Sequence, residues 1–219
     1  MGMDLYYMDL SAPCRSVYLL AKSLGIDMNL KVTDLMKGEN MTPEFIKMNP
    51  QHIVPTLDDN GFYLWESRAI LTYLATKYDS GKNFYPSDPQ ARAVVDQRLY
   101  FDMGTLYERF AKSVYPLMFE GGKSVDPEAV TKLKEALSWL NDFIGTAGHV
   151  AGDKQTVADF AIASTVASIE GTGVVNVSDY ANVHSWLESQ KRLPGYAEAN
   201  DVGAKELGDL FKQALAKVA

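Results

Sequence analysis

The pattern of hydrophobic and polar positions divides the first 80 residues into strands and helices that alternate along the chain. Runs rich in aromatic and β-branched residues predict strands at residues 5–8, 30–33, 54–58 and 62–65. Apolar residues at helical spacing predict helices that begin near Ser11, Thr42 and Ser67, each with a capping residue, and Gly25 ends the first of them. The predicted order is β-α-β-(α)-β-β-α, in which the helix at Thr42 is short.

Strand patterns are confined to this first part. A polar connection with Gly and Pro follows at residues 81–88, and beyond it the apolar spacing is helical. Helices are expected from Asp88 to about Phe119, from Asp126 to just before Gly145, after Thr156, and at the C-terminus. The segment after Thr156 is apolar almost all round, which predicts a buried central helix behind a capping box. We therefore predict an α/β domain at residues 1–80 and an all-α domain, a helical bundle, at residues 89–219.

Charge narrows the classes of partner. The 219 residues include 21 basic and 28 acidic side chains, a formal net charge of −7. Residues 1–80 hold 7 basic and 10 acidic side chains and the remainder 14 and 18, so both parts are acidic and neither has a basic stripe. A protein that binds nucleic acid or an anionic membrane surface through charge needs such a stripe. Neither partner is expected.

Cysteine usage and the absence of long apolar runs indicate the compartment. Cys14 is the only cysteine, which excludes a disulfide within the chain and a cysteine-rich zinc site. No apolar run approaches the length of a membrane span, and the N-terminus lacks the basic and apolar regions of a signal peptide. We expect a cytoplasmic protein.

The segment Ser11-Ala12-Pro13-Cys14, between the first strand and the first helix, is the first candidate for chemistry. A serine at a helix N-terminus faces free backbone amides and the positive end of the helix dipole, where an anion is stabilised. If a substrate brings a thiol, the Ser11 hydroxyl can donate a hydrogen bond to the thiolate without attacking anything itself. The simpler interpretation is a serine that only caps the helix. Cys14 lies one turn inside and is expected to be a packed thiol.

Two later segments also stand where chemistry is feasible. Pro55 cannot donate to a sheet, so it is either a trans residue at the start of a strand or part of a cis bond in a tight turn, and both alternatives stay open. Glu66-Ser67-Arg68 opens a helix, with Ser67 as the expected cap. Free amides there can hold a carboxylate, and Glu66 can bind an ammonium, as the zwitterionic end of an amino acid requires.

The histidines and acidic residues give no sign of a metal or hydrolytic centre. His52 lies in a loop near Pro55, and His149 and His184 are expected at the surface, without metal-ligand spacing. The acidic residues form no evident catalytic pair, and the glycines near residue 150 lack the lysine of a phosphate-binding loop. No metal is predicted.

Six segments, in order over nearly the whole chain, resemble the cytosolic glutathione S-transferases, most closely the insect delta class. They lie at residues 11–15, 34–39, 49–57, 65–70, 97–107 and 150–159. The resemblance implies a thioredoxin-like domain at residues 1–80 that binds glutathione and a helical domain at residues 89–219 that contributes a hydrophobic substrate site. It implies conjugation of the glutathione thiolate to hydrophobic electrophiles in detoxification, with dehydrochlorinase or peroxidase side activities. Glutathione is then a cosubstrate, and no cofactor is implied.

The resemblance also assigns roles to residues by their place in the motifs. The residues implied to bind glutathione are Ser11, Asn40, His52, Val54, Pro55, Glu66, Ser67 and Arg68. Among them Ser11 activates the thiol, Val54 pairs its backbone with the cysteinyl part, and His52 reaches the glycine carboxylate. The residues implied to form the hydrophobic substrate site are Tyr107, Tyr115, Phe119 and Phe211.

Two departures from the delta pattern keep a second function open. Asn40 stands where many members have a histidine, and Asp9-Leu10 stands where Pro-Gly usually precedes the serine. A carboxylate beside the thiol opposes thiolate formation. The alternative is therefore a non-catalytic carrier of apolar ligands on the same fold.

Two other mechanisms and the assembly state complete the expectations. Other transferase classes use a tyrosine on the first strand, here Tyr6 or Tyr7, but the match around Ser11 favours serine. A glutaredoxin-like oxidoreductase is disfavoured because Ser11 occupies the place of the attacking cysteine. The resemblance further implies a homodimer in which residues 98–107 lie near the two-fold axis and Asp102 approaches the partner's glutathione site.

Overall fold

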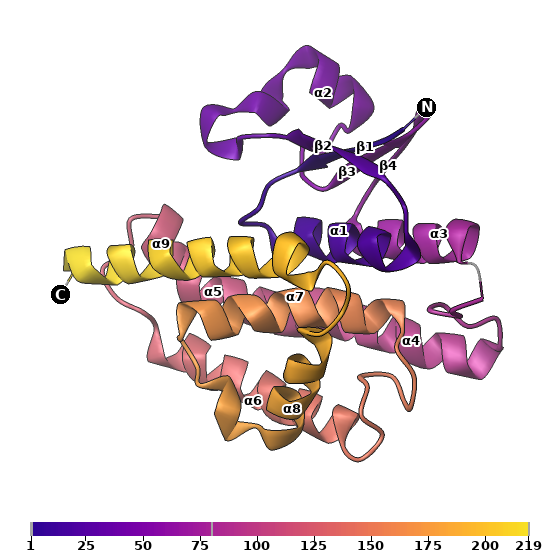
Figure 1. Ribbon diagram of the computed structural model, residues 1–219. Helices are drawn as coiled ribbons and strands as arrows, with labels where there is room; N and C mark the ends of the chain where they lie inside the picture. Colours follow the sequence, from indigo (N-terminus) through magenta and orange to yellow (C-terminus); the bar gives the residue numbers. More distant parts are fainter. Residues whose placement is uncertain (1, 80, 219) are drawn as a thin grey trace.

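A computed structural model describes residues 2–79 and 81–218, and in its first part a sheet lies against α1 and α3 (Figure 1). The elements of this part are β1 (Met3–Tyr7), α1 (Ala12–Leu24), β2 (Met28–Val32), α2 (Pro43–Met48), β3 (Thr56–Asp59), β4 (Phe62–Trp65) and α3 (Ser67–Tyr78). The order is the predicted one, with small shifts at the strand ends. Gly25 ends α1 in the left-handed conformation at φ 73°, as expected of a C-terminal glycine.

The sheet brings three loops to one edge. The described residues form a four-stranded sheet in the order β2-β1-β3-β4, in which β1 pairs with β2 in parallel and the other pairs are antiparallel. Tyr6 pairs with Thr56, and Thr56 pairs with Trp65. The chain therefore leaves β1, enters β3 and leaves β4 at the same edge of the sheet, and the predicted glutathione-binding segments meet there.

The second part of the chain is helical, as predicted. Its α-helices are α4 (Pro89–Phe101), α5 (Tyr107–Phe119), α6 (Pro127–Ile144), α7 (Val157–Thr172), α8 (Ala181–Gln190) and α9 (Val202–Val218). The single helix expected between Asp88 and Phe119 contains a π-helical turn, Asp102–Leu106, and Asp102 at its start is completely buried. The helix α8 was not predicted, although Trp186 and Leu187 give it a buried apolar face.

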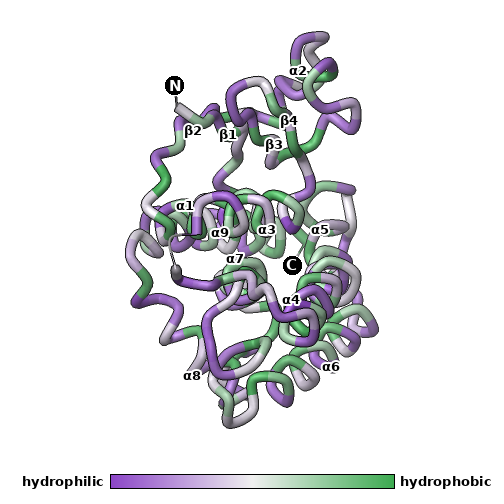
Figure 2. The backbone as a smooth tube through the Cα atoms, turned by 90° about the vertical axis from the view of Figure 1, so that its right-hand side faces the viewer, coloured by the Kyte–Doolittle hydropathy of each residue, from purple (hydrophilic) through white to green (hydrophobic). Residues whose placement is uncertain are grey.

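The predicted central helix is α7, which lies between α1 on one side and α6 and α8 on the other (Figures 1 and 2). Its capping box, formed by Thr156 and Asp159, is present. Gly171 of α7 and Gly208 of α9 allow the two backbones to touch, because a Cβ on Gly208 would lie 2.1 Å from the Gly171 carbonyl oxygen. His149, expected at the surface, is instead half-buried with Nδ1 3.3 Å from Asp159 Oδ1. No helix within the described residues is long and apolar enough to cross a membrane.

Candidate active site

Ser11 caps the N-terminus of α1, as predicted. Its backbone is extended, and its Oγ accepts a hydrogen bond of 3.3 Å from the Cys14 amide. Because the oxygen accepts from the helix, the hydroxyl proton can be donated away from it. Ser11 is half-buried, whereas Cys14 is fully buried and burial raises the pKa of its thiol to about 12. Cys14 is thus the packed thiol expected from the sequence.

The two tyrosines of β1 pack against neighbouring aromatic rings. Tyr7 is 2% exposed and packs edge-on against Tyr18, with ring centroids 5.9 Å apart. Burial and a hydrogen bond to Asp9 raise the pKa of Tyr7. Tyr6 points to the opposite face of the sheet and packs against Phe45. Ser11 is therefore better placed than either phenol to meet a thiol at the edge of the sheet.

The Val54-Pro55 peptide bond is cis, which resolves the alternative left open by the sequence. The fully buried Asn49 holds this loop, since its Nδ2 donates to the Ile53 carbonyl at 3.1 Å and to Thr56 Oγ1 at 2.9 Å. Sequence reasoning missed Asn49. Its signal is the Asn-Pro pair ahead of a strand, a typical turn former.

The cap of α3 differs from the prediction by one residue. Glu66, at φ 67°, is the N-cap, and Ser67 is the first helical residue and is buried. The Ser67 Oγ accepts a hydrogen bond of 2.9 Å from Arg68 Nη1. The Glu66 carboxylate stays exposed beside the free amides of the first turn. The segment thus offers an acceptor for an ammonium and donors for a carboxylate.

Arg68 is held across the boundary between the sheet and the helical part. Its Nε donates to Asp102 Oδ2 at 3.1 Å, and its Nη2 forms an ion pair with the same oxygen. Thr165 of α7 donates to the other carboxylate oxygen at 2.8 Å. Asp102 is completely buried within its own chain. Within this chain both of its oxygens accept hydrogen bonds, from Arg68 and from Thr165. The expectation that it approaches a partner's glutathione site stays a prediction.

His52 and Asn40 act together. The Asn40 Nδ2 donates to the His52 backbone carbonyl at 2.6 Å, and His52 is exposed with φ at 44°. Asn40 thus holds the backbone of the loop that carries His52, a contact that the sequence did not predict.

The predicted hydrophobic residues divide into two groups. The hydroxyls of Tyr107 and Tyr115 lie 3.0 Å apart, and the Tyr115 ring lies 5.4 Å from that of Phe119. The two tyrosines are half-buried and Phe119 is 48% exposed, so all three can meet a ligand. Phe211 is only 2% exposed and belongs to the core between α9 and its neighbours. Its burial favours a core role over the assignment to the substrate site, which stays a prediction.

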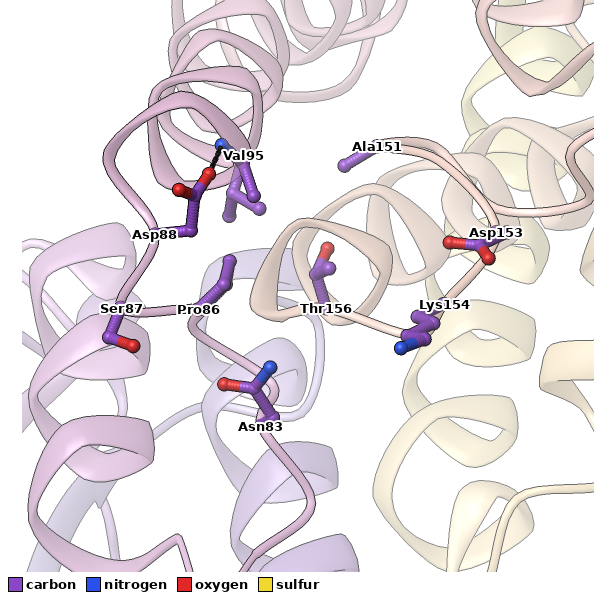
Figure 3. A pocket seen from close by; sticks show the side chains of 10 residues that line it. Asn83, Pro86, Ser87, Asp88, Val95, Ala151, Asp153, Lys154 and Thr156 are labelled. Atoms are coloured by element: carbon purple, nitrogen blue, oxygen red, sulfur yellow. Dashed lines mark hydrogen bonds between the residues drawn. The ribbon is translucent and has the colours of Figure 1, made fainter.

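A cavity of about 300 Å³ lies away from these residues (Figure 3). Side chains of the connecting segment, among them Asn83 and Ser87, face Lys154 and Thr156 across it. It contains none of the residues implied to bind glutathione. A second cavity, of about 380 Å³ between α3 and α4, is lined by Glu66 and Arg68.

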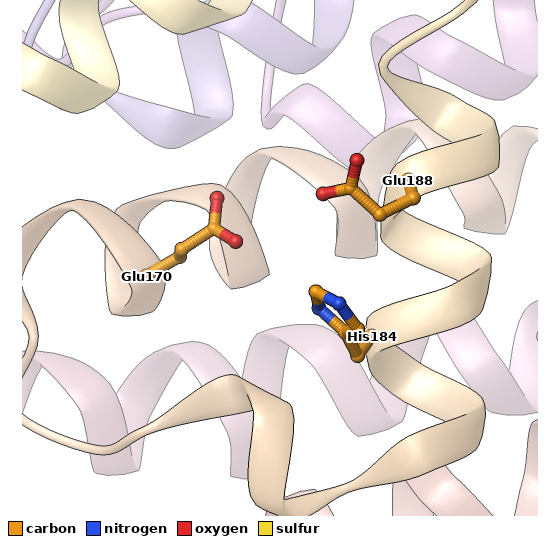
Figure 4. A group of neighbouring side chains, drawn as sticks. All are labelled: Glu170, His184 and Glu188. Carbon is orange, nitrogen blue, oxygen red and sulfur yellow. The ribbon is translucent and has the colours of Figure 1, made fainter.

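His184 is exposed, as expected, yet it lies close to two acidic residues (Figure 4). Its ring and the carboxylates of Glu170 and Glu188 have ligand atoms within 4.8 Å of one another. The Lys191 ammonium lies 2.8 Å from Glu170 and 2.7 Å from Glu188. A cation that belongs to the chain itself therefore already pairs with both carboxylates.

Comparison with known proteins gives consistent matches along the chain. Residues 1–76 match the family described as Glutathione S-transferase, N-terminal domain, and residues 99–194 match Glutathione S-transferase, C-terminal domain. A delta-class glutathione transferase of Nilaparvata lugens is 52% identical with a TM-score of 0.93, over 97% of this chain and 100% of that one. A Bombyx mori glutathione transferase is 45% identical with a TM-score of 0.92, over 96% of this chain and 98% of that one. A glutathione transferase homologue of Drosophila mojavensis, solved with bound glutathione, is 32% identical with a TM-score of 0.90, over 97% of each chain.

Proposed function

The chain belongs to the glutathione S-transferase family and is a glutathione transferase, and we propose that Ser11 activates the glutathione thiol for attack on apolar electrophiles. The observation that carries this proposal is the position of the Ser11 hydroxyl. It caps α1 at the sheet edge where cis-Pro55 and the start of α3 also lie. A thiolate placed there meets an O–H donor and the positive end of a helix dipole.

Glutathione is anchored, in this proposal, at its two charged ends. Glu66 binds the γ-glutamyl ammonium, while the Ser67 amide and hydroxyl bind the adjacent carboxylate at the N-terminus of α3. Val54 pairs its backbone with the cysteinyl part, and His52, supported by Asn40, donates to the glycine carboxylate. These contacts fix the thiol within reach of Ser11 and reduce the entropy lost in the reaction.

The chemical step is a nucleophilic substitution or addition by sulfur. The thiol proton leaves to solvent, and the thiolate accepts the Ser11 hydrogen bond. Its electron pair forms the new carbon–sulfur bond while a leaving group, such as a halide, departs with the electron pair of the broken bond. Because thiolate rather than thiol attacks, each lowering of the thiol pKa by one unit raises the thiolate fraction about tenfold as long as the pKa stays above the pH.

We propose flat, apolar electrophiles as the substrate class. Tyr107, Tyr115 and Phe119 form an edge-to-face aromatic series on α5, and such surfaces pack well against aryl groups. The Tyr107 and Tyr115 hydroxyls add one polar point to an otherwise apolar wall. The dehydrochlorinase and peroxidase side activities would use the same thiolate.

A non-catalytic carrier is the competing proposal, and Asp9 is the residue that favours it. Asp9 lies two positions before Ser11, but it interacts by hydrogen bonding with the Tyr7 phenol, which reduces its effect on a nearby thiolate. A carrier would be retained on immobilised glutathione and would show no turnover on a broad panel of electrophiles.

The test compares Ser11→Ala with Tyr7→Phe in conjugation of glutathione to an activated aryl halide. We expect the serine variant to lose most turnover while it is still retained on immobilised glutathione, and the tyrosine variant to keep its turnover. The opposite pattern would refute the role of Ser11. A wild-type protein that is neither retained nor active would contradict glutathione binding by this site.

We also propose that the protein is a cytoplasmic homodimer. Apolar side chains are exposed on β4 and around the end of α4, notably Phe62 (49%), Tyr63 (40%), Tyr100 (69%) and Met103 (43%). A symmetric dimer would cover such a surface with its own copy. Sedimentation of Tyr100→Glu beside the wild type tests this, since the charge should produce monomers.

A further inference from the structure

Arg15 is a buried cation that lacks a carboxylate partner. Its side chain is 0% exposed, and its Nη1 donates to the Asn200 backbone carbonyl at 2.9 Å and to Asn200 Oδ1 at 3.0 Å. Its Nη2 donates to Ser168 Oγ, and its Nε has no hydrogen-bond partner within the described chain. All of these acceptors are neutral, so no ion pair at residues 2–79 or 81–218 compensates the charge.

Arg68 provides the contrast. Both arginines come from the sheet-containing part, and each is held by a residue of a π-helical turn, Asp102 in one case and Asn200 in the other. The carboxylate of Asp102 neutralises Arg68, whereas the amide of Asn200 leaves the charge of Arg15 intact. Burial of an uncompensated cation is unfavourable and lowers the pKa of Arg15. An anion brought near it would therefore be stabilised.

The candidate thiolate site is the place where such an anion would arrive. Arg15 lies one turn beyond Ser11, and its backbone amide donates to the Ser11 carbonyl at 3.0 Å. A Cβ built on Gly203 would lie 2.8 Å from Arg15 Cδ and 2.0 Å from the Asp9 carbonyl oxygen. The arginine stem thus passes beside the loop that leads into Ser11.

The groups around Arg15 are largely desolvated, so its charge is only weakly screened. The titratable groups around Arg15 are Tyr7 and Asp9 ahead of α1, Cys14 on α1, Tyr107 and Tyr115 on α5, and Tyr196 and Asp201 near the second π-helical turn. Tyr107 and Tyr115 also belong to the proposed electrophile site, so the charge of Arg15 acts on that site as well. The phenols are protonated at neutral pH, and Asp201 is exposed to solvent. Charges act more strongly in such desolvated surroundings than in water.

We propose that the counter-ion of Arg15 is the thiolate of glutathione bound at Ser11, so that this buried guanidinium lowers the pKa of the thiol without touching it. The inference rests on the proposed role of Ser11. It assigns Arg15 a function beyond holding two parts of the chain together. It also explains why a neutral amide, rather than a carboxylate, receives the guanidinium.

The test is Asn200→Asp, which supplies Arg15 with a carboxylate while the arginine stays in place. The pKa of enzyme-bound glutathione is measured from its ultraviolet thiolate absorbance against pH, together with the pH profile of kcat/KM. We expect the thiol pKa to rise by about one unit, which is a tenfold loss of thiolate at a fixed pH below it. Arg15→Gln should give a similar rise, with the folded state of each variant checked by circular dichroism and thermal unfolding.

Gln190→Glu is the matched control, because it makes the same change at a buried amide that bonds Gln155 instead of Arg15. It should leave the thiol pKa unchanged. A folded Asn200→Asp variant with a wild-type thiol pKa would overturn the inference and leave Arg15 a purely structural residue. If the wild type itself does not lower the pKa of glutathione, the proposed role of Ser11 fails as well, so the two failures are distinguishable.

Discussion

Replacing Asp102 by asparagine removes a single charge from the boundary between the sheet and the helical part. Asp102 is completely buried and accepts from Arg68 through Nε and Nη2 and from Thr165 through Oγ1. Asparagine keeps the shape and one acceptor oxygen, but it presents an NH2 group where the second oxygen was. The Arg68 side chain, only 15% exposed, would then lack a counter-ion.

The expected loss of stability follows from the burial of this ion pair. Removing one partner of a buried ion pair typically destabilises a protein by about 3–5 kcal/mol. Because one acceptor and the volume are retained, we expect the lower end, about 3 kcal/mol, or roughly a hundredfold change in the unfolding constant. Thr165→Val removes one neutral donor from the same carboxylate and should cost only about 1 kcal/mol.

Urea unfolding measures both variants, at one protein concentration because the stability of a dimer depends on it. A double-mutant cycle of Asp102→Asn and Arg68→Met isolates the interaction between these two side chains. The double variant should lose less stability than the sum of the losses in the two single variants. Glutathione retention should weaken in Asp102→Asn, since Arg68 also donates to Ser67. A loss of stability below about 0.5 kcal/mol, within the range of an ordinary surface change, would refute the reasoning.

Three further predictions concern other residues. Asp159 raises the pKa of His149. His149→Ala should therefore lower the unfolding temperature most below about pH 6.5, and the difference from the wild type should vanish as pH rises through the raised pKa. Equal losses at low and at high pH would contradict this. Phe211→Ala should destabilise the fold by about 3–5 kcal/mol. Phe119→Ala should instead raise the KM for an aryl electrophile at nearly unchanged stability, and equal destabilisation by both would refute the division made here. Cys14 should resist thiol reagents until urea unfolds the protein, so rapid labelling of the native state would disprove its burial.

Features that depend on neighbouring residues were predictable from the sequence. The cap at Ser11 and the end of α1 at Gly25 each need only a few adjacent positions, and the structure has both. The capping box ahead of α7 is equally local. Pro55 indicated where a strand begins, but the sequence did not show whether the bond before it is cis or trans. Both isomers are compatible with the start of a strand, and only the folded loop selects one.

Features that depend on contacts across the chain were not predictable. The apolar stripe of α9 contains Phe211, but its spacing does not indicate whether a given side chain belongs to the core or to a substrate site. The burial of Arg15 and Asp102 depends on partners 185 and 34 residues away in the chain. The positive φ of Glu66, which places the cap of α3 one residue earlier than predicted, has no signal in the neighbouring residues.

The net charge of −7 raises the question of how an acidic protein would hold an anionic tripeptide. Exposed acids farther than about 8 Å from a bound ligand are largely screened at physiological salt, so they oppose binding only weakly. Desolvated positive groups are screened far less, and two of them converge here: the N-termini of α1 and α3 open at one edge of the sheet. Arg68 adds little net field because Asp102 neutralises it. Arg15, which has only neutral acceptors, adds a whole buried charge. Affinity for a small anion is then decided by which cations are left uncompensated inside the fold, and net charge bears mainly on polyanions, which need a continuous basic surface.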